Sequence, residues 1–168
     1  MDSAPTAEAR LADLARQWGD AGDRRAVFAE CYLVMTRSVE ENIRAGSFND
    51  GVWVGRLLDR FADYYFDAVD SYGGALGVRV CPAVWREALD ACSDPLCHPL
   101  QALMLGINAH INHDLALALV DVLDDWPTLD EEARQRRRDD HELVNTIIDD
   151  TTDEVQKDVV GRWSPAAE

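Results

Sequence analysis

One long apolar segment decides the fold of this chain. Residues 99–126 read PLQALMLGINAHINHDLALALVDVLDDW, and apolar side chains recur there at spacings of three and four, the period of an α-helix. They occupy most of the helix circumference, which is typical of a helix that other helices surround. At about 100° per residue, the inward stripe is predicted to contain Leu100, Leu103, Ile107, Ile111, Ala118 and Val122.

Helical periodicity continues on both sides of this segment, and caps or breakers mark the ends of the other helices. We expect these helices after Thr6 to about Gly19, from Arg24 to Ala45 before Gly46, from Gly51 to Tyr72, from Pro82 through Leu89, and from Asp139 to Val160. No alternating β-branched run bounded by turn pairs indicates a sheet. The prediction is an all-α, single-domain helical bundle of about five to six helices around a central apolar helix, with residues 1–22 as an N-terminal helical arm and 23–168 as the bundle domain.

The charge balance restricts the partners that the chain is expected to bind. Its 168 residues carry a formal charge of −16, and the field of such a surface repels nucleic acid and anionic membranes. The basic run at 134–138 lies between acidic residues, so a solvated helix end is predicted there. A small-molecule substrate or ligand is the expected partner.

Cysteine usage and the absence of targeting signals bear on location. The four cysteines have no zinc-site spacing, so free thiols are expected. The first residues lack a basic, apolar leader pattern, and no run of eighteen apolar residues occurs. A cytoplasmic location is therefore the expectation.

His110 and Asp114 are the leading candidates for chemistry. They lie four residues apart on one side of the apolar helix, where an unpaired carboxylate would cost several kcal/mol to bury. Either Asp114 orients the imidazole for acid–base catalysis, or both bind one divalent metal ion. Glu40, within the apolar face of the second helix, is predicted to supply the second catalytic carboxylate or the third metal ligand.

Further polar and aromatic residues are expected near this pair. Asp121 lies two turns on, along the same side of the helix, and Asp140 is predicted to point inward or to cap a helix end. Tyr32, Tyr65 and Trp85 occur at helical spacing, which is typical of a core but also suits the lining of a small apolar substrate cavity.

The segment LGINAHINHDL, residues 105–115, resembles the signature of a bacterial helical family catalogued as domain of unknown function 5995. Further similarity extends the resemblance from about Arg24 to Asp158 and leaves out the N-terminal helix. It implies an all-α fold and a shared polar centre at Asn108, His110, Asn112 and Asp114, with the two asparagines as substrate-binding candidates. It implies no reaction.

Two classes of function remain open at this point. The first is an enzyme acting on a small organic molecule, either metal-assisted and hydrolase-like or metal-free, such as a cyclase, dehydratase or isomerase in specialised metabolism. The second is a non-catalytic helical ligand-binding or interaction protein, in which the buried polar residues serve only to fix the packing of the helices.

Overall fold

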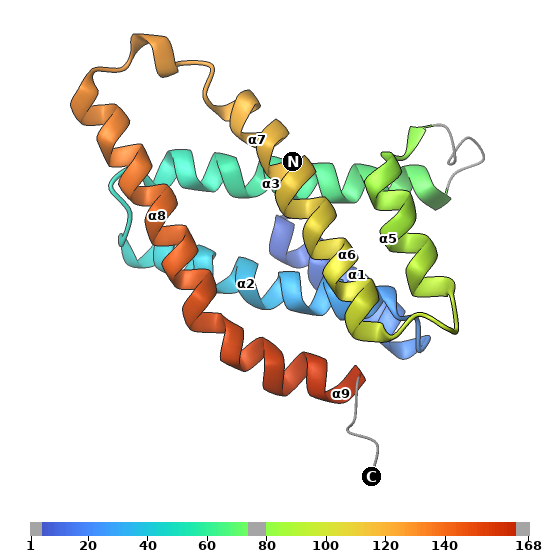
Figure 1. Ribbon diagram of the computed structural model, residues 1–168. Coiled ribbons are helices and arrows are strands. Elements are labelled where there is room, and N and C mark those ends of the chain that lie inside the picture. Colours follow the sequence, from blue (N-terminus) through green and yellow to red (C-terminus); the bar gives the residue numbers. More distant parts are fainter. Residues whose placement is uncertain (1–4, 74–79, 164–168) are drawn as a thin grey trace.

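Helices arranged in three layers build the molecule in the computed structural model, which describes residues 5–73 and 80–163 (Figure 1). The α-helices are α1 (Ala7–Asp20), α2 (Arg25–Ala45), α3 (Gly51–Gly73), α5 (Ala83–Ser93), α6 (Pro99–Ala109), α7 (Leu115–Val122), α8 (Glu131–Glu154) and α9 (Gly161–Trp163). The π-helical segments η1 (His110–Asp114) and η3 (Val155–Val160) join α6 to α7 and α8 to α9, and η2 (Trp126–Thr128) is a 3₁₀ turn. These two ranges contain no strand, and the prediction of an all-α, single-domain bundle is confirmed.

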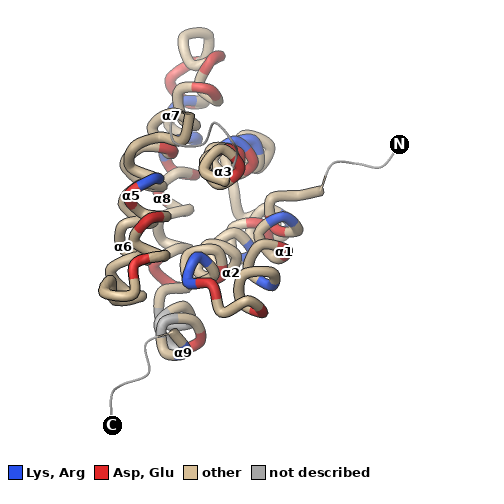
Figure 2. Tube along the Cα trace, turned by 90° about the vertical axis from the view of Figure 1, so that its right-hand side faces the viewer, with Lys and Arg blue, Asp and Glu red and all other residues tan. Residues whose placement is uncertain are grey.

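The middle layer consists of α2 and α3, as the two perpendicular views agree. The first helix, α1, lies on one side of it, and α5, α6, α7 and α8 lie on the other (Figure 2). The continuous rod of α6, η1 and α7 crosses this middle layer and contacts both α2 and α3. One side of the rod is therefore covered by the bundle.

Helix ends follow the capping signals of the sequence. The Thr6 side chain accepts a hydrogen bond from the backbone N–H of Ala9, and Gly46 ends α2 in the left-handed region at φ 73°. The long C-terminal helix begins at Glu131, eight residues before the predicted start. The reason is that Asp130 caps it, accepting from the N–H of Ala133 at 2.8 Å.

Two apolar clusters fill the space between the layers. The first joins α1, α2, α3, α5 and α6, and it includes Leu11 and Trp18 of α1. The second joins α2, α3, α7 and α8. Phe61 of α3 is half-buried and packs against both clusters. The Phe61 ring thus lies at the boundary between the two apolar clusters.

The basic run at 134–138 is only partly a solvated helix end, and the prediction is wrong for Arg137. Its side chain is buried, and its guanidinium donates to both carboxylate oxygens of Asp125 at 2.6 and 2.8 Å. It also contacts the Asp50 carboxylate at 3.3 Å. Because Arg carries five donors in a planar fork, one side chain ties α8 to the start of α3 and to the turn after α7.

The inward stripe predicted for the apolar helix is wrong at two positions. Leu103, Ala118 and Val122 are buried, but Leu100 and Ile111 are 43% and 45% exposed. The rod lies at the edge of the bundle in Figure 2, so its neighbours cover only one side. Apolar character around a helix did not by itself say which side the bundle would cover.

Gly106 lets α6 lie close against the Phe28 side chain of α2. A Cβ atom at this position would lie 2.9 Å from Cδ2 of Phe28, well inside van der Waals contact. We expect Gly106→Ala to lower the free energy of unfolding by about 1–3 kcal/mol, because the Phe28 ring must move within a packed aromatic cluster. Urea unfolding measures the change. Gly55→Ala, where nothing lies within 4 Å of the new Cβ, is the matched control and should not destabilise the protein.

Candidate functional site

Asp114 is the centre of a buried hydrogen-bonded group. The side chain is 1% exposed, and its Oδ2 accepts from Trp85 Nε1 and pairs with His110 Nδ1, both at 2.8 Å. Its Oδ1 pairs with His113 Nδ1, also at 2.8 Å. A carboxylate only accepts hydrogen bonds, so both imidazoles carry their proton on Nδ1 when they are neutral. The group joins α5 to η1.

A ring of aromatic side chains surrounds His110. The Phe61 ring stacks on the imidazole with a centroid distance of 3.6 Å and an interplanar angle of 8°. The Tyr32 ring meets it edge-on at 4.4 Å, and three further rings have centroids between 5.7 and 6.1 Å away: Phe28, Trp85 and Tyr65. The fold thus places Tyr32, Tyr65 and Trp85 around His110, and their role in lining a substrate cavity stays a prediction.

The second nitrogen of His110 has no hydrogen-bond partner among the described residues, and the same is true of two hydroxyls on α2. These atoms are His110 Nε2, Tyr32 Oη and Thr36 Oγ1, and all three side chains are buried. Tyr32 and Thr36 are four apart, so they lie on one side of α2. The hydrogen bond to Asp114 keeps the proton of the neutral imidazole on Nδ1. The unpartnered Nε2 therefore presents a lone pair to the space enclosed by the aromatic side chains.

Burial sets the protonation of this site. Desolvation lowers the pKa of His110, and the hydrogen bond and charge of Asp114 offset only part of that effect. Desolvation likewise raises the pKa of Tyr32 well above its usual range, and the nearby charge of Asp114 adds to the rise. Both groups are therefore neutral near pH 7, with Nε2 an acceptor and the phenol a donor.

The lowered pKa of His110 predicts how stability depends on pH. The unfolded histidine has a pKa of about 6.5, so on acidification the unfolded chain takes up a proton before the folded one does. The free energy of unfolding should then fall as the pH drops below about 6.5 towards the folded pKa. Urea unfolding between pH 7.5 and 5.5 measures this slope, and His110→Gln should reduce it. Equal slopes in both proteins would contradict the assignment.

A π-helical turn shapes the site. In η1 the backbone N–H of Leu115 bonds to the carbonyl of His110, five residues back, so the turn holds one residue more than an α-helical turn does. The extra residue changes the direction of the side chains that follow it. Such single-turn insertions occur frequently at functional sites, and this one coincides with the His110–Asp114 pair.

Asn108 and Asn112 do not belong to the buried centre, so the implied polar centre is wrong for them. Both are exposed, and the Asn112 amide donates to Asn108 Oδ1 at 2.8 Å. The reason is the helical period: Gly106, Ala109 and His110 take the covered side of the rod, so the positions between them face outward. The signature segment thus has two distinct sides.

The fold does not bring Glu40 to His110. Its carboxyl group hydrogen-bonds that of Glu8 on α1, and burial together with this bond raises the pKa of Glu40. Asp121 is also directed away from the centre, and its carboxylate accepts from Arg60 Nε at 2.6 Å and Tyr64 Oη at 2.8 Å. Within the described ranges no three His, Cys, Asp or Glu side chains converge as metal ligands do. Glu40 is therefore in no position to act as the third ligand.

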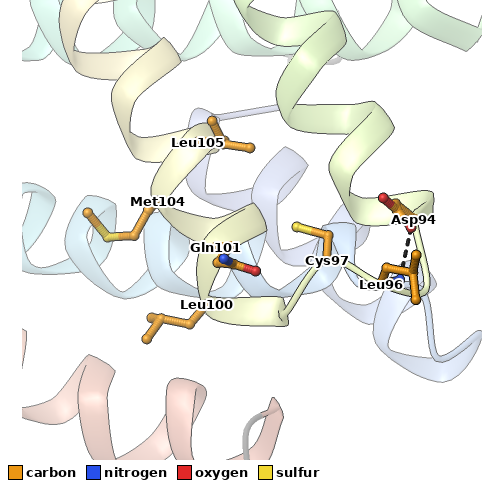
Figure 3. A pocket seen from close by; sticks show the side chains of 7 residues that line it. All are labelled: Asp94, Leu96, Cys97, Leu100, Gln101, Met104 and Leu105. Carbon is orange, nitrogen blue, oxygen red and sulfur yellow. Dashed lines mark hydrogen bonds between the residues drawn. The ribbon is translucent and has the colours of Figure 1, made fainter.

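Two small cavities adjoin the aromatic side chains that surround His110. One of about 10 Å³ lies beside Phe28, Tyr65 and Trp85. The other has a volume of about 70 Å³ and lies between α2, α3, the rod and α8, on the side of Phe61 that faces the second apolar cluster. Leu57, Val144 and Ile148 are among the residues that line it. A much larger surface groove of about 680 Å³ runs along α6, but its lining does not include His110 (Figure 3).

Sequence reasoning missed two contributors to the site, Phe61 and His113. Phe61 stacks on His110 from α3, and nothing in the spacing of its sequence indicates a contact with a histidine on another helix. His113 lies within the π turn, and its Nδ1 pairs with Asp114 Oδ1 of the adjacent residue at 2.8 Å. The short HxxHD pattern of residues 110–114 is a local signal for this contact.

The fold and the site together define a class: an all-α bundle with a histidine–aspartate group enclosed by aromatic rings. The model of a family of unknown function, DUF5995, matches residues 5–168, and the chain belongs to this family. The match includes α1, so the resemblance predicted from Arg24 to Asp158 was too short. No curated protein and no solved structure matches the chain.

Proposed function

We propose that this chain is an enzyme that acts on a small, largely apolar organic molecule by metal-free acid–base chemistry. The observation that carries the proposal is the buried, unpartnered Nε2 of His110, opposite the Nδ1 that Asp114 holds. This is the arrangement in which a carboxylate fixes the tautomer and orientation of a catalytic imidazole. His110 would take a proton from the substrate or return one to it.

The surroundings of His110 suit a proton transfer without water. Aromatic rings exclude solvent from the imidazole, and the unpartnered hydroxyls of Tyr32 and Thr36 are available to bind a polar group of the substrate. Proton transfers of this kind accompany cyclisation, dehydration and isomerisation. The donor set favours the metal-free route, because Asp114 already accepts from three donors and Glu40 lies with Glu8.

Access to His110 would require Phe61 to move. The adjoining cavity of about 70 Å³ has room for roughly two waters at about 30 Å³ each, which is less than a substrate occupies. The Phe61 ring lies between this cavity and the imidazole. Rotation of the ring would open the cavity to His110. Phe61 is half-buried, whereas the other four aromatic side chains around His110 are buried, so fewer contacts oppose a rotation of its ring.

A comparison of the wild type with His110→Gln tests the proposal. Each protein is incubated with fractionated mixtures of small organic molecules, and consumption is followed by mass spectrometry. Loss of a general acid–base group should lower the rate about 10²–10⁴-fold while the melting temperature changes little. Asp67→Ala, an exposed site on α3, is the matched control and should keep full activity. Equal rates for His110→Gln and wild type would refute the proposal.

The second candidate is a non-catalytic helical protein in which the same group fixes the packing of α5 against η1. The favouring observation is that the two cavities found beside these aromatic side chains among the described residues, of about 10 and 70 Å³, are smaller than a substrate. In that case His110→Gln would lower the free energy of unfolding by about 1–3 kcal/mol, as loss of a buried hydrogen bond does, and no compound would be consumed. Melting temperature and turnover, measured on the same samples, separate the two functions.

A further inference from the structure

The outer side of the rod formed by α6, η1 and α7 is an unusual surface. Seven large apolar side chains on it or beside it are between 38% and 92% exposed: Leu96, Leu100, Met104, Leu105, Ile111, Leu117 and Val120. We call these residues the outer face. Four of them line the groove in Figure 3, where Leu100 and Met104 project from α6 to the same side. Exposed apolar patches of this extent mark interaction sites in soluble proteins.

Charge is also absent from the N-terminal two thirds of this surface. No Asp, Glu, Lys or Arg occurs between Asp94 and Asp114, in a chain in which 29% of the residues are charged. The exposed polar residues there are uncharged, among them Gln101, Asn108 and Asn112. This composition resembles the core of an interface, from which charged residues are depleted.

The hydrogen-bonded asparagines lie midway along the outer face, between Met104 and Leu117. The Asn112 amide donates to Asn108 Oδ1, which leaves further donors and acceptors of both amides pointing to solvent. An amide has both a donor and an acceptor, so it pairs with another copy of itself, as a single asparagine does within an apolar helix seam. The face is therefore complementary to its own copy.

We propose that the outer face binds a second copy of this chain, with the two rods antiparallel and a twofold axis near Asn108. A twofold interface needs one patch that fits itself, and this face is apolar at both ends and self-pairing in its middle. With a net charge of −16, two copies that met through the remaining surface would repel each other, whereas this face brings little like charge together. The proposal is independent of any catalysis at His110.

The antiparallel direction follows from the charges at the two ends of the rod. Asp121 and Asp124 lie at its C-terminal end, whereas residues 95–113, which include its N-terminal part, contain no Asp, Glu, Lys or Arg. In a parallel pair the aspartates of both copies would lie side by side. In the antiparallel pair they lie opposite the uncharged part of the partner rod instead, near the positive end of the α6 dipole.

The size of the face agrees with a dimer. The apolar stretch Pro99–Val122 is 24 residues long, or about 36 Å at 1.5 Å per residue and 10–12 Å wide with side chains. This strip provides about half of the roughly 800 Å² that each partner of a standard interface buries. The groove beside Leu96 and the adjoining side of α5, which lies along the same edge in Figure 2, would supply the remainder.

Sedimentation velocity over a range of concentrations tests the proposal. The wild type should sediment as a dimer, and Met104→Glu and Ile111→Glu should each raise the dimer dissociation constant by more than about 100-fold, because a buried glutamate would have no partner. Val52→Glu is the matched control: Val52 is 80% exposed on α3 and should leave the dimer intact. Circular dichroism verifies that each variant folds.

A cross-linking experiment tests the direction of the pair. Under mild oxidation Asn108→Cys should form a covalent dimer, whereas Val120→Cys, far from the proposed axis, should not exceed the wild-type background. The proposal is overturned if the wild type stays monomeric at all concentrations. A monomer whose outer face binds phosphatidylcholine vesicles instead overturns it as well. So does a Met104→Glu variant that dimerises as the wild type does. Preferential cross-linking of Val120→Cys overturns the antiparallel arrangement.

Discussion

Asp114→Ala should lower the free energy of unfolding by about 3–5 kcal/mol, among the largest effects of any single substitution in this chain. The substitution removes the acceptor for Trp85 Nε1, His110 Nδ1 and His113 Nδ1 at once. Trp85 and His110 are buried, so their donors would have no water to replace the carboxylate. Chemical denaturation followed by circular dichroism measures the loss.

Two further variants serve as comparisons for the loss of stability of Asp114→Ala. Asp114→Asn keeps the shape of the side chain but replaces one acceptor oxygen by an amide donor, so we expect an intermediate loss of stability. Asp67→Ala removes an exposed carboxylate from α3 and should change stability by less than about 0.5 kcal/mol. If Asp114→Ala were as stable as Asp67→Ala, the carboxylate would not hold α5 against η1, and the geometry described above would be wrong.

Asp140→Ala should have the second largest effect, a loss on the order of 3 kcal/mol. The buried Asp140 carboxylate accepts from the backbone N–H groups of Asn49 and Asp50 at 2.8 and 2.7 Å, and from the Asn49 side-chain amide at 2.9 Å. These donors precede α3, where backbone N–H groups lack helical partners. The substitution would therefore detach α8 from the start of α3.

The adjacent residue offers a matched control for this prediction. Asp139 is exposed, and its Oδ1 accepts a hydrogen bond from the Gln135 amide on the same helix at 2.7 Å. Asp139→Ala should thus alter the urea midpoint only slightly. Comparable losses for Asp139→Ala and Asp140→Ala would show that the effect comes from α8 itself rather than from its contact with α3.

Most of the fold could be predicted because its signals are local. Thr6 and Gly46 mark helix ends through their own side-chain and backbone chemistry, and the apolar period identifies each helix without knowledge of its neighbours. The inward position of Asp140 was likewise readable from its helical phase. The start of α8 was missed, because the charged first turns of that helix carry almost no apolar period.

The candidate site was only partly predictable. His110 and Asp114 were found because their spacing of four is a property of one helix. Glu40 was misplaced because its partner, Glu8, comes from α1, and no pattern in either helix states which helices pack together. Only the family resemblance placed Asn108 and Asn112 at the polar centre, and a shared sequence motif does not state which of its residues the neighbouring helices will cover.

By itself, the sequence determined that this protein is an all-α bundle and that a histidine and an aspartate share one turn of its apolar helix. Those features depend on backbone hydrogen bonds and side-chain spacing within single segments. Only the tertiary structure decided that α2 and α3 form the middle layer, that Phe61 encloses His110, and that the outer face is exposed. These features depend on contacts between residues far apart in the chain. Burial of apolar surface favours such contacts but is non-directional, so the fit of side-chain shapes determines which helices pack together.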